Sequence, residues 1–249
     1  MDWFEEWFDS PLYEKLYANR DEMEAARLVE LLEKTLPLDR CSKILDLGCG
    51  RGRHSINLCQ KGYDVTGIDL SDEAIATARE KAAKEELEHI RFQVGDMRNP
   101  LPRTFDAIVN LFTTFGYFET DEENSKVLES VRKMLKPGGI FVLDYLNANK
   151  VRKSYVPSEE GEFQNIHYEI ERYISDNSIH KDIEFSGNNI GSTKKYSERV
   201  KLYDFEWFKR EMAVHNLVID QVYGDYEGHD FDPNTSSRLL IISHLKSEK

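Results

Sequence analysis

The stretch "SKILDLGCGRGRH", residues 42 to 54, places a short apolar run directly before a turn with three glycines in five positions. Lys43–Leu47 is expected to form a buried strand, and Arg53–Lys61 a helix. Glycines between them let the backbone bend sharply and let a ligand approach it closely. The sequence therefore predicts a nucleotide-type turn between this strand and this helix.

The charges around this turn indicate which ligand it holds. The dinucleotide-binding motif requires a small residue at the position where this chain has Arg53. In addition, Asp46 lies two residues before the turn. A pyrophosphate beside that carboxylate would be repelled, since like charges about 4 Å apart cost on the order of 4 kcal/mol at an intermediate dielectric. A ligand with a sulfonium and an ammonium group would instead be attracted.

Two further carboxylates are expected at the same edge of the sheet. Asp69 ends the strand containing "DVTGI", and Asp96 follows the next strand in "VGDM". The carboxyl ends of parallel strands face one crevice, so both should lie near Asp46. Asp69 alone is compatible with a nicotinamide enzyme, but three carboxylates together with Arg53 favour S-adenosylmethionine, or its product S-adenosylhomocysteine.

The chain around this turn alternates short strands with helices, which predicts an α/β fold with a parallel sheet and right-handed crossovers. Ser71 is expected to cap one helix, and Pro137-Gly138-Gly139 to end another. The expected strands are Lys43–Leu47, Tyr63–Asp69, Ile90–Val94, Phe105–Leu111 and Ile140–Asp144, and the expected helices are Glu22–Leu36, Arg53–Lys61, Ser71 to Glu86 and Asp121–Leu135.

The pattern changes after residue 150. Phe163–Ser175, Ile179–Ser186 and Lys194–Tyr203 are β-like and are separated by "SDNS" and "SGNNIGS", which predicts a small antiparallel meander. A helix over Phe205–His215 and two strands, Val218–Tyr223 and Arg238–Leu245, close the chain. We therefore expect a core formed by residues 1–150 and 204–249 and a β-rich insert, residues 151–203, that acts as a substrate lid or a dimer contact.

Composition limits the classes of function. The chain has 249 residues, 40% of them hydrophobic, and a formal charge of −13. This charge repels phosphate backbones, so we expect no nucleic-acid partner. No apolar run is long enough to span a bilayer, the acidic aromatic N-terminus is unlike a secretory signal, and three cysteines fit no disulfide framework. A cytoplasmic protein is expected, a monomer or a homodimer, without a resident metal.

Five ordered segments resemble the motifs of class I S-adenosylmethionine-dependent methyltransferases. They are "ILDLGCGRGRH", "VTGIDLS", "VGDM", "FDAIVNLFTTFGYF" and "LKPGGIFVLDYLN", and together they cover about residues 42–147. The resemblance implies a Rossmann-like, mostly parallel sheet of seven strands whose last strand is antiparallel. The N-terminal helical extension and the β-rich insert resemble those of bacterial small-molecule methyltransferases.

The resemblance also implies roles for individual residues. Gly48 and Gly50 would approach the methionine moiety, and Asp69 would accept hydrogen bonds from both ribose hydroxyls. Asp96 would accept from the adenine amino group, with Leu70 and Met97 against the ring. The complete set of cofactor candidates is Tyr13, Tyr17, Arg20, Asp46, Gly48, Cys49, Gly50, Asp69, Leu70, Asp96, Met97, Asn110 and Leu111; Asn110 and Leu111 would line the sulfonium end, and Cys49 carries no evident chemistry.

Several of these residues have two interpretations. In this family an N-terminal arm often folds over the cofactor, so Tyr13, Tyr17 or Arg20 would bind the methionine carboxylate; alternatively, the aromatic arm packs on the core. His54 is expected to pack or hydrogen-bond locally. The candidates for the methyl acceptor, each with core or surface packing as its alternative, are Phe115, Tyr117, His167, Tyr168, Arg199 and Tyr203.

The predicted activity is methyl transfer to a small-molecule acceptor by in-line displacement. The acceptor, the atom methylated and any catalytic base are not identified by the sequence. An RNA or protein methyltransferase is the alternative enzyme, although the Asn/Asp-Pro-Pro-aromatic motif of amino-directed DNA methyltransferases is absent after the fourth strand. A protein that binds S-adenosylmethionine without turnover is the second alternative.

Overall fold

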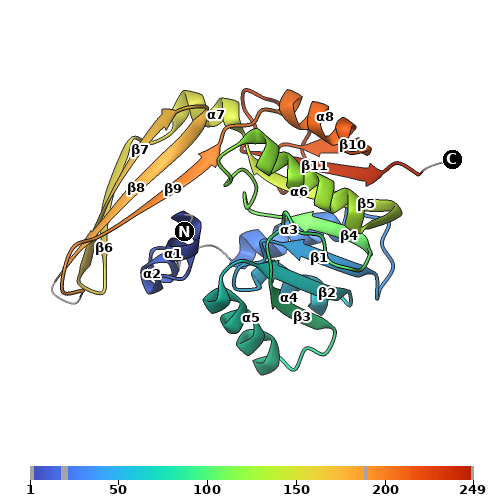
Figure 1. Cartoon of the computed structure of the whole chain (residues 1–249), viewed down its shortest axis with the longest axis horizontal. Coiled ribbons are helices and arrows are strands. Elements are labelled where there is room, and N and C mark those ends of the chain that lie inside the picture. The colour runs from blue at the N-terminus through green and yellow to red at the C-terminus, as the bar shows by residue number, and fades with distance from the viewer. Residues whose placement is uncertain (1–2, 18–21, 188–189, 248–249) are drawn as a thin grey trace.

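The structure, a computed structural model, describes residues 3–17, 22–187 and 190–247 and contains two sheets (Figure 1). The larger sheet has seven strands and the smaller has four. The strands of the larger sheet are β1 (Lys43–Leu47), β2 (Asp64–Asp69), β3 (Ile90–Val94), β4 (Phe105–Asn110), β5 (Leu135–Leu146), β10 (Leu217–Tyr223) and β11 (Arg238–Leu245).

The larger sheet has the strand order β10-β11-β5-β4-β1-β2-β3. Strands β1 to β5 pair in parallel, whereas β11 is antiparallel to both of its neighbours, β5 and β10. The order reverses between β1 and β4, and the crevice above such a reversal is where open α/β sheets bind ligands. The predicted Rossmann-like sheet with an antiparallel last strand is confirmed.

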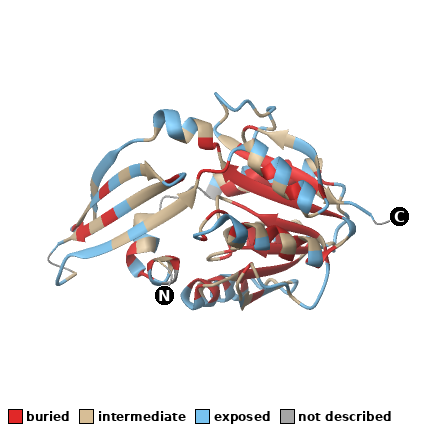
Figure 2. Cartoon of the chain, turned by 45° about the horizontal axis from the view of Figure 1, so that its top comes forward, coloured by how far each residue is buried: buried red, intermediate tan, exposed pale blue. Residues whose placement is uncertain are grey.

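Helices cover both faces of this sheet, so the central strands are buried on both sides (Figure 2). In β4 the side chain of Ile108 packs with α6 and α8, and those of its neighbours Ala107 and Val109 pack with α3 and α4. The helices of the described chain are α1 (Trp3–Phe8), α2 (Pro11–Leu16), α3 (Glu22–Thr35), α4 (Arg53–Gln60), α5 (Asp72–Lys84), α6 (Asp121–Met134), α7 (Ala148–Ser154) and α8 (Phe205–Val214).

The smaller sheet is an antiparallel meander in the order β6-β7-β8-β9. Its strands are β6 (Ser158–Phe163), β7 (Ile166–Ser175), β8 (Ser178–Ser186) and β9 (Lys194–Lys201). Two-residue turns with positive φ at both positions, Gln164-Asn165 and Asp176-Asn177, join the first three strands. This backbone matches the twist of hairpin strands.

Three segments differ from the sequence prediction. The expected strand Phe163–Ser175 is broken at Gln164-Asn165, and β6 and α7 were not expected. Glutamine is not a residue favoured in such turns, and β6 ("SEEGEF") has little apolar alternation, so neither gave a signal. Strand β5 begins at Leu135 rather than Ile140, because the chain enters the sheet directly at the end of α6.

The N-terminal helices α1 and α2 pack against the smaller sheet and lie beneath β9, between the two sheets (Figure 1). Trp7 is fully buried there, its ring 4.5 Å from that of Tyr196. The Trp7 indole N–H donates to Oε1 of Glu198 over 2.7 Å, and the Tyr17 hydroxyl donates to the same atom over 2.6 Å. Glu198 on β9 therefore holds the N-terminal segment against the insert.

Packing beneath the glycine turn generates the first prediction. Gly52 has φ +80°, and an added Cβ would lie 2.8 Å from Phe92 and 3.0 Å from Ala78. Gly138 has a similar φ of +73° but open space around it. We expect Gly138→Ala to lower the free energy of unfolding by about 1–2 kcal/mol, for backbone strain alone. Gly52→Ala should cost a further 1–3 kcal/mol, roughly, for overpacking.

Urea denaturation of both variants measures the difference. Equal losses at the two positions would show that the turn is not tightly packed against α5 and β3.

Candidate functional site

A cavity of about 470 Å³ lies at the carboxyl edge of the larger sheet, within the range of small-molecule sites. Four parts of the chain line it: the glycine turn with the ends of β2 and β3, the loop after β4, the N-terminal helices with β9, and the start of β11. The lining residues used below are Phe4, Phe8, Tyr13, Glu14, Tyr17, Gly48, Cys49, Gly50, Arg51, Arg53, His54, Asp69, Leu70, Met97, Leu111, Phe112, Thr113, Tyr117, Glu198, Val200 and Arg238.

The carboxylate of Asp69 ties two turns together at the floor of this cavity. Its Oδ2 accepts from the backbone N–H of Gly50 over 2.8 Å, and its Oδ1 accepts from that of Ser71 over 3.0 Å. Burial raises the pKa of Asp69, and these hydrogen bonds oppose that shift. Each oxygen retains a lone pair, so Asp69 can still accept ligand hydroxyls.

Asp46 is buried below the glycine turn rather than in the cavity wall. It lies between Leu45 and Leu47 on β1, so its side chain faces α4, where Ser55 Oγ donates to Asp46 Oδ2 over 2.5 Å. Burial, together with the nearby charge of Asp69, raises the pKa of Asp46 to about 7, although the hydrogen bond from Ser55 opposes this shift. The structure therefore places this carboxylate behind the turn, where it supports the start of α4.

The three residues predicted to contact the adenine do not all line the cavity. Met97 and Leu70 line the cavity, but Asp96 is not among the lining residues. Asp96 binds the guanidinium of Arg98 with Nη2–Oδ2 at 2.6 Å, and Arg98 also lies 4.0 Å from the centroid of the Phe118 ring. An adenine amino group would have to share the Asp96 carboxylate with Arg98. The role predicted for Asp96 stays a prediction.

The loop after β4 owes its shape to the buried carboxylate of Asp144. Phe112 and Thr113 both have left-handed backbone conformations, with φ of 60° and 63°. The Phe112 N–H donates to Asp144 Oδ2 over 2.8 Å, and the Thr113 N–H donates to the Asp144 carbonyl over 3.0 Å. Tyr226 and Arg238 also donate to this carboxylate, over 2.7 and 2.9 Å.

Arg238 then reaches the cavity and donates through Nη2 to Thr113 Oγ1 over 2.8 Å. The sequence analysis missed this residue as a site candidate, because it lies on the last strand and far from the motifs. Asn110 is completely buried and donates to the Leu47 carbonyl, whereas the adjacent Leu111 lines the cavity. Cys49 lines it too, and burial raises the pKa of its thiol.

The N-terminal helices supply an aromatic wall that includes Phe4, Phe8, Tyr13 and Tyr17. Arg20 lies outside the described residues. Arg51, which the sequence analysis did not single out, lines the cavity 3.7 Å from Glu14, and its Nε is buried without a partner in the described chain. Tyr13 and Tyr17 pack in an aromatic cluster and also line the cavity. Binding of the methionine carboxylate by the arm stays a prediction.

The acceptor candidates separate into three groups. Tyr117 lines the cavity. Phe115 and Tyr203 belong to the core, where Tyr203 stacks on Trp207 at 3.6 Å and donates to Asp121. The remaining candidates, His167, Tyr168 and Arg199, lie in the smaller sheet and are not among the lining residues; the insert contributes Glu198 and Val200 instead.

Comparison with known proteins agrees with this geometry. The sequence model of a family described as "Methyltransferase domain" matches residues 38–201. The chain belongs to this methyltransferase family. YqeM of Bacillus subtilis (strain 168), a protein named as a methyltransferase, is 28% identical over 224 residues, which cover 87% of this chain and 88% of YqeM.

Two further similarities concern an enzyme and a fold. A dTDP-3-amino-3,4,6-trideoxy-alpha-D-glucopyranose N,N-dimethyltransferase of Streptomyces venezuelae is 31% identical over 137 residues, 53% of this chain and 55% of that enzyme. The crystal structure of an S-adenosylmethionine-dependent methyltransferase from Clostridium acetobutylicum ATCC 824 superposes with a TM-score of 0.78 and 21% identity, covering 95% and 97% of the two chains. The predicted class I methyltransferase family and fold are confirmed.

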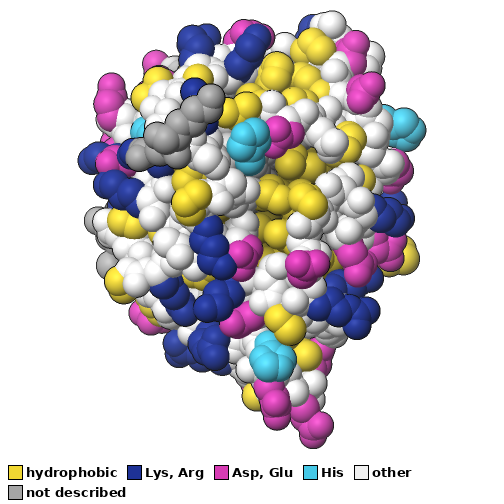
Figure 3. Space-filling view, turned by 90° about the vertical axis from the view of Figure 1, so that its right-hand side faces the viewer, with side chains coloured by type: hydrophobic (Ala, Val, Ile, Leu, Met, Phe, Trp, Pro, Cys, Tyr) yellow, Lys and Arg dark blue, Asp and Glu magenta, His cyan; other side chains and the backbone are white. Residues whose placement is uncertain are grey.

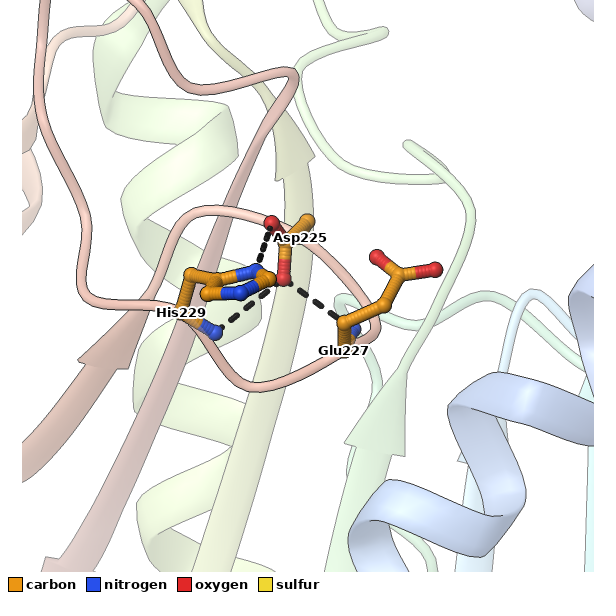
Figure 4. Close-up of side chains that lie close together, drawn as sticks. All are labelled: Asp225, Glu227 and His229. Atoms are coloured by element: carbon orange, nitrogen blue, oxygen red, sulfur yellow. Dashed lines mark hydrogen bonds and ion pairs between the residues drawn. The ribbon is translucent and has the colours of Figure 1, made fainter.

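A second cluster of candidate ligands lies outside the methyltransferase cavity, in the loop after β10. Asp225, Glu227 and His229 place their ligand atoms within 4.8 Å of one another (Figure 4). Asp225 accepts from the ring Nδ1 of His229 over 2.7 Å and from the backbone N–H groups of Glu227 and His229. These hydrogen bonds fold the loop on itself and account for the proximity of the three side chains.

Charged side chains of both signs occur on the surface. On the face shown in Figure 3, acidic and basic side chains are interspersed around a stretch of hydrophobic ones. None of the described helices is both long enough and apolar enough to cross a membrane.

The buried carboxyl of Asp46 generates a prediction about pH. Its pKa of about 7 in the folded protein, against an ordinary 3.8, means that the folded state binds this proton more tightly than the unfolded state. The free energy of unfolding should therefore fall as the pH rises from about 4 to about 7. Asp46→Asn keeps an acceptor for Ser55 and should remove this dependence, a difference on the order of a few kcal/mol.

Urea denaturation of both proteins between pH 4 and pH 8 measures this effect. Parallel pH profiles for the two proteins would mean that Asp46 is not desolvated beneath the turn.

Proposed function

We propose that the protein transfers the methyl group of S-adenosylmethionine to a small-molecule acceptor. One observation carries the proposal: a single cavity joins the glycine turn and Asp69 to an aromatic wall from the N-terminal helices and to Glu198 and Val200 of β9. One end of the cavity thus has the chemistry of a nucleoside site and the other has that of a site for a small organic molecule.

The chain's own residues position the cofactor. Asp69 accepts from the ribose hydroxyls, Gly48 and Gly50 admit the methionine moiety close to the backbone, and Leu70 and Met97 contact the adenine. The bound cofactor supplies an activated methyl group, so the protein has mainly to align donor and acceptor. Alignment alone contributes roughly 7–11 kcal/mol in favourable cases.

The acceptor would lie between the loop after β4 and the N-terminal helices. Tyr117, Phe8 and Val200 provide an apolar surface there, and Glu198 provides a carboxylate within the aromatic wall. The similar Streptomyces enzyme is named for dimethylation of an amino sugar nitrogen. An amine on a small polar molecule is therefore the first acceptor class to test. The core, residues 1–150 and 204–249, would hold the cofactor. In the insert, residues 151–203, strand β9 would face the acceptor.

The first prediction here concerns the ribose contact. Asp69→Asn should weaken S-adenosylhomocysteine binding about 10- to 100-fold, because charge-assisted hydrogen bonds contribute about 1.5–3 kcal/mol. Asp64→Asn, at the opposite end of β2, should leave the affinity unchanged. Isothermal titration calorimetry measures both, and unchanged binding by Asp69→Asn would refute the ribose assignment. Binding of NAD in place of the sulfur nucleoside would refute the choice of cofactor.

The second prediction concerns the acceptor wall. Val200→Phe adds volume where β9 faces the cavity, so it should reduce transfer of a radiolabelled methyl group into a metabolite extract while S-adenosylhomocysteine still binds normally. Val156→Phe, at an exposed position of the insert, is the matched control. Undiminished transfer by Val200→Phe would place the acceptor elsewhere. Absence of any labelled small molecule with the unaltered protein would contradict the proposed function.

A further inference from the structure

The imidazole of His54 is the least explained group in the cavity wall. His54 lies two residues after Gly52, lines the cavity and is only 8% exposed. Its Nε2 is buried and has no hydrogen-bond partner in the part of the chain that the structure describes. Buried polar atoms are nearly always paired, and an unpaired one costs about 1–3 kcal/mol. The sequence analysis expected His54 to pack or hydrogen-bond locally, and its ring does lie beside that of Phe112. Nε2 has no hydrogen-bond partner among the described residues, so a ligand atom is its natural partner.

The groups around His54 are basic. The ring of Phe112 lies 6.1 Å from the His54 ring, 4.7 Å from the guanidinium of Arg53 and 5.8 Å from that of Arg238. Burial, with Arg53 and Arg238 nearby, lowers the pKa of His54 to about 3. The imidazole is therefore neutral at physiological pH, and in one of its two tautomers Nε2 carries a proton and can donate a hydrogen bond.

The backbone favours an anion at the same place. Helix α4 begins at Arg53 after Gly52, whose left-handed backbone leaves the helix without a side-chain cap, and its first turn has no acidic residue. The N–H groups of such an end carry partial positive charge. The nearby charges of Asp144 and Asp46 are already engaged, the first by Arg238 and the second, partly protonated, by Ser55.

We propose that His54, Arg53, Arg238 and the N-terminus of α4 form a carboxylate-binding corner of the cavity, in which His54 Nε2–H donates to the carboxylate. The inference rests on the proposed function, since the ligand in view is the one that the cavity holds during methyl transfer. Two sources supply a carboxylate: the amino-acid end of the cofactor, or a carboxylate on the acceptor. Proximity to the glycine turn favours the cofactor.

The test compares S-adenosylhomocysteine with its decarboxylated analogue, in which hydrogen replaces the carboxylate. His54→Phe keeps the ring that packs on Phe112 but removes Nε2, so calorimetry should show S-adenosylhomocysteine affinity falling about 10- to 100-fold while affinity for the analogue changes less than about 3-fold. His54→Gln, whose amide nitrogen can occupy the position of Nε2, should restore most of the preference. Gln60→Ala, at the other end of α4, is the control.

Nitrogen-15 spectra of the imidazole report on the corner without turnover. Nε2 should carry the proton, and its resonance should shift when S-adenosylhomocysteine binds but not when the analogue binds. With the analogue bound, added acetate should then produce a similar shift in the unaltered protein and none in His54→Phe.

If the acceptor supplies the carboxylate, the same measurements should give a different pattern. His54→Phe would then bind S-adenosylhomocysteine and the analogue with unchanged affinities, and acetate would shift the imidazole resonance in the protein saturated with S-adenosylhomocysteine. Unchanged affinities together with no acetate response would overturn the carboxylate corner. Failure of the unaltered protein to bind S-adenosylhomocysteine at all would overturn the proposed function instead, so the two failures are distinguishable.

Discussion

The hydrogen bonds of one carboxylate hold the ligand end of this fold together. Asp69 accepts from Gly50 in the turn after β1 and from Ser71 in the turn after β2. These turns start α4 and α5, so the positions of both helices relative to the sheet depend on this contact. The left-handed backbone of Gly48, Gly50 and Gly52 is the complementary requirement, because glycine has no Cβ and adopts it most readily. The shape of this site therefore depends on contacts within the chain itself.

The buried carboxylate of Asp144 holds segments together on the other side of the cavity. Asp144 receives hydrogen bonds from Phe112, Tyr226 and Arg238, which lie on three separate segments. Burying a charge is costly unless it is paired and hydrogen-bonded, and here the partners supply both conditions. The same contacts direct Arg238 and Phe112 toward the cavity. Fold stability and ligand chemistry are thus coupled at Asp144, as they are at Asp69.

The core of the fold could be predicted because its signals are local. The apolar runs of β1, β2 and β5, the glycine turn and the Ser71 cap each lie within a few residues of the element they specify. Short elements such as β6 and α7 gave no such signal, since their sequences are mostly polar and have no regular apolar alternation. The break between strands that "SDNS" predicted is the turn Asp176-Asn177, whereas the turn Gln164-Asn165, with its weaker turn composition, was not predicted.

The candidate site was predictable on one side only. Asp69, Gly48 and Gly50 occur in one continuous motif region, whereas Glu198 and Arg238 reach the cavity through pairing of distant segments. Phe115 and Tyr203 were candidates for the acceptor site, but both lie within the core. Their sequence pattern fits either a cavity wall or the core. Only the neighbours brought by the tertiary fold distinguish these outcomes. His54 also required the structure, because an unpaired buried atom leaves no mark in a sequence.

The central claim is that the carboxyl edge of the sheet binds the cofactor through Asp69, with the amino-acid end directed toward α4. The crystal structure of the protein with S-adenosylhomocysteine tests it most directly. The account predicts both ribose hydroxyls within hydrogen-bond distance of the Asp69 carboxylate and the sulfur facing the aromatic wall of Tyr117 and the N-terminal helices. A nucleoside bound with its ribose away from Asp69, or outside the cavity altogether, would contradict it.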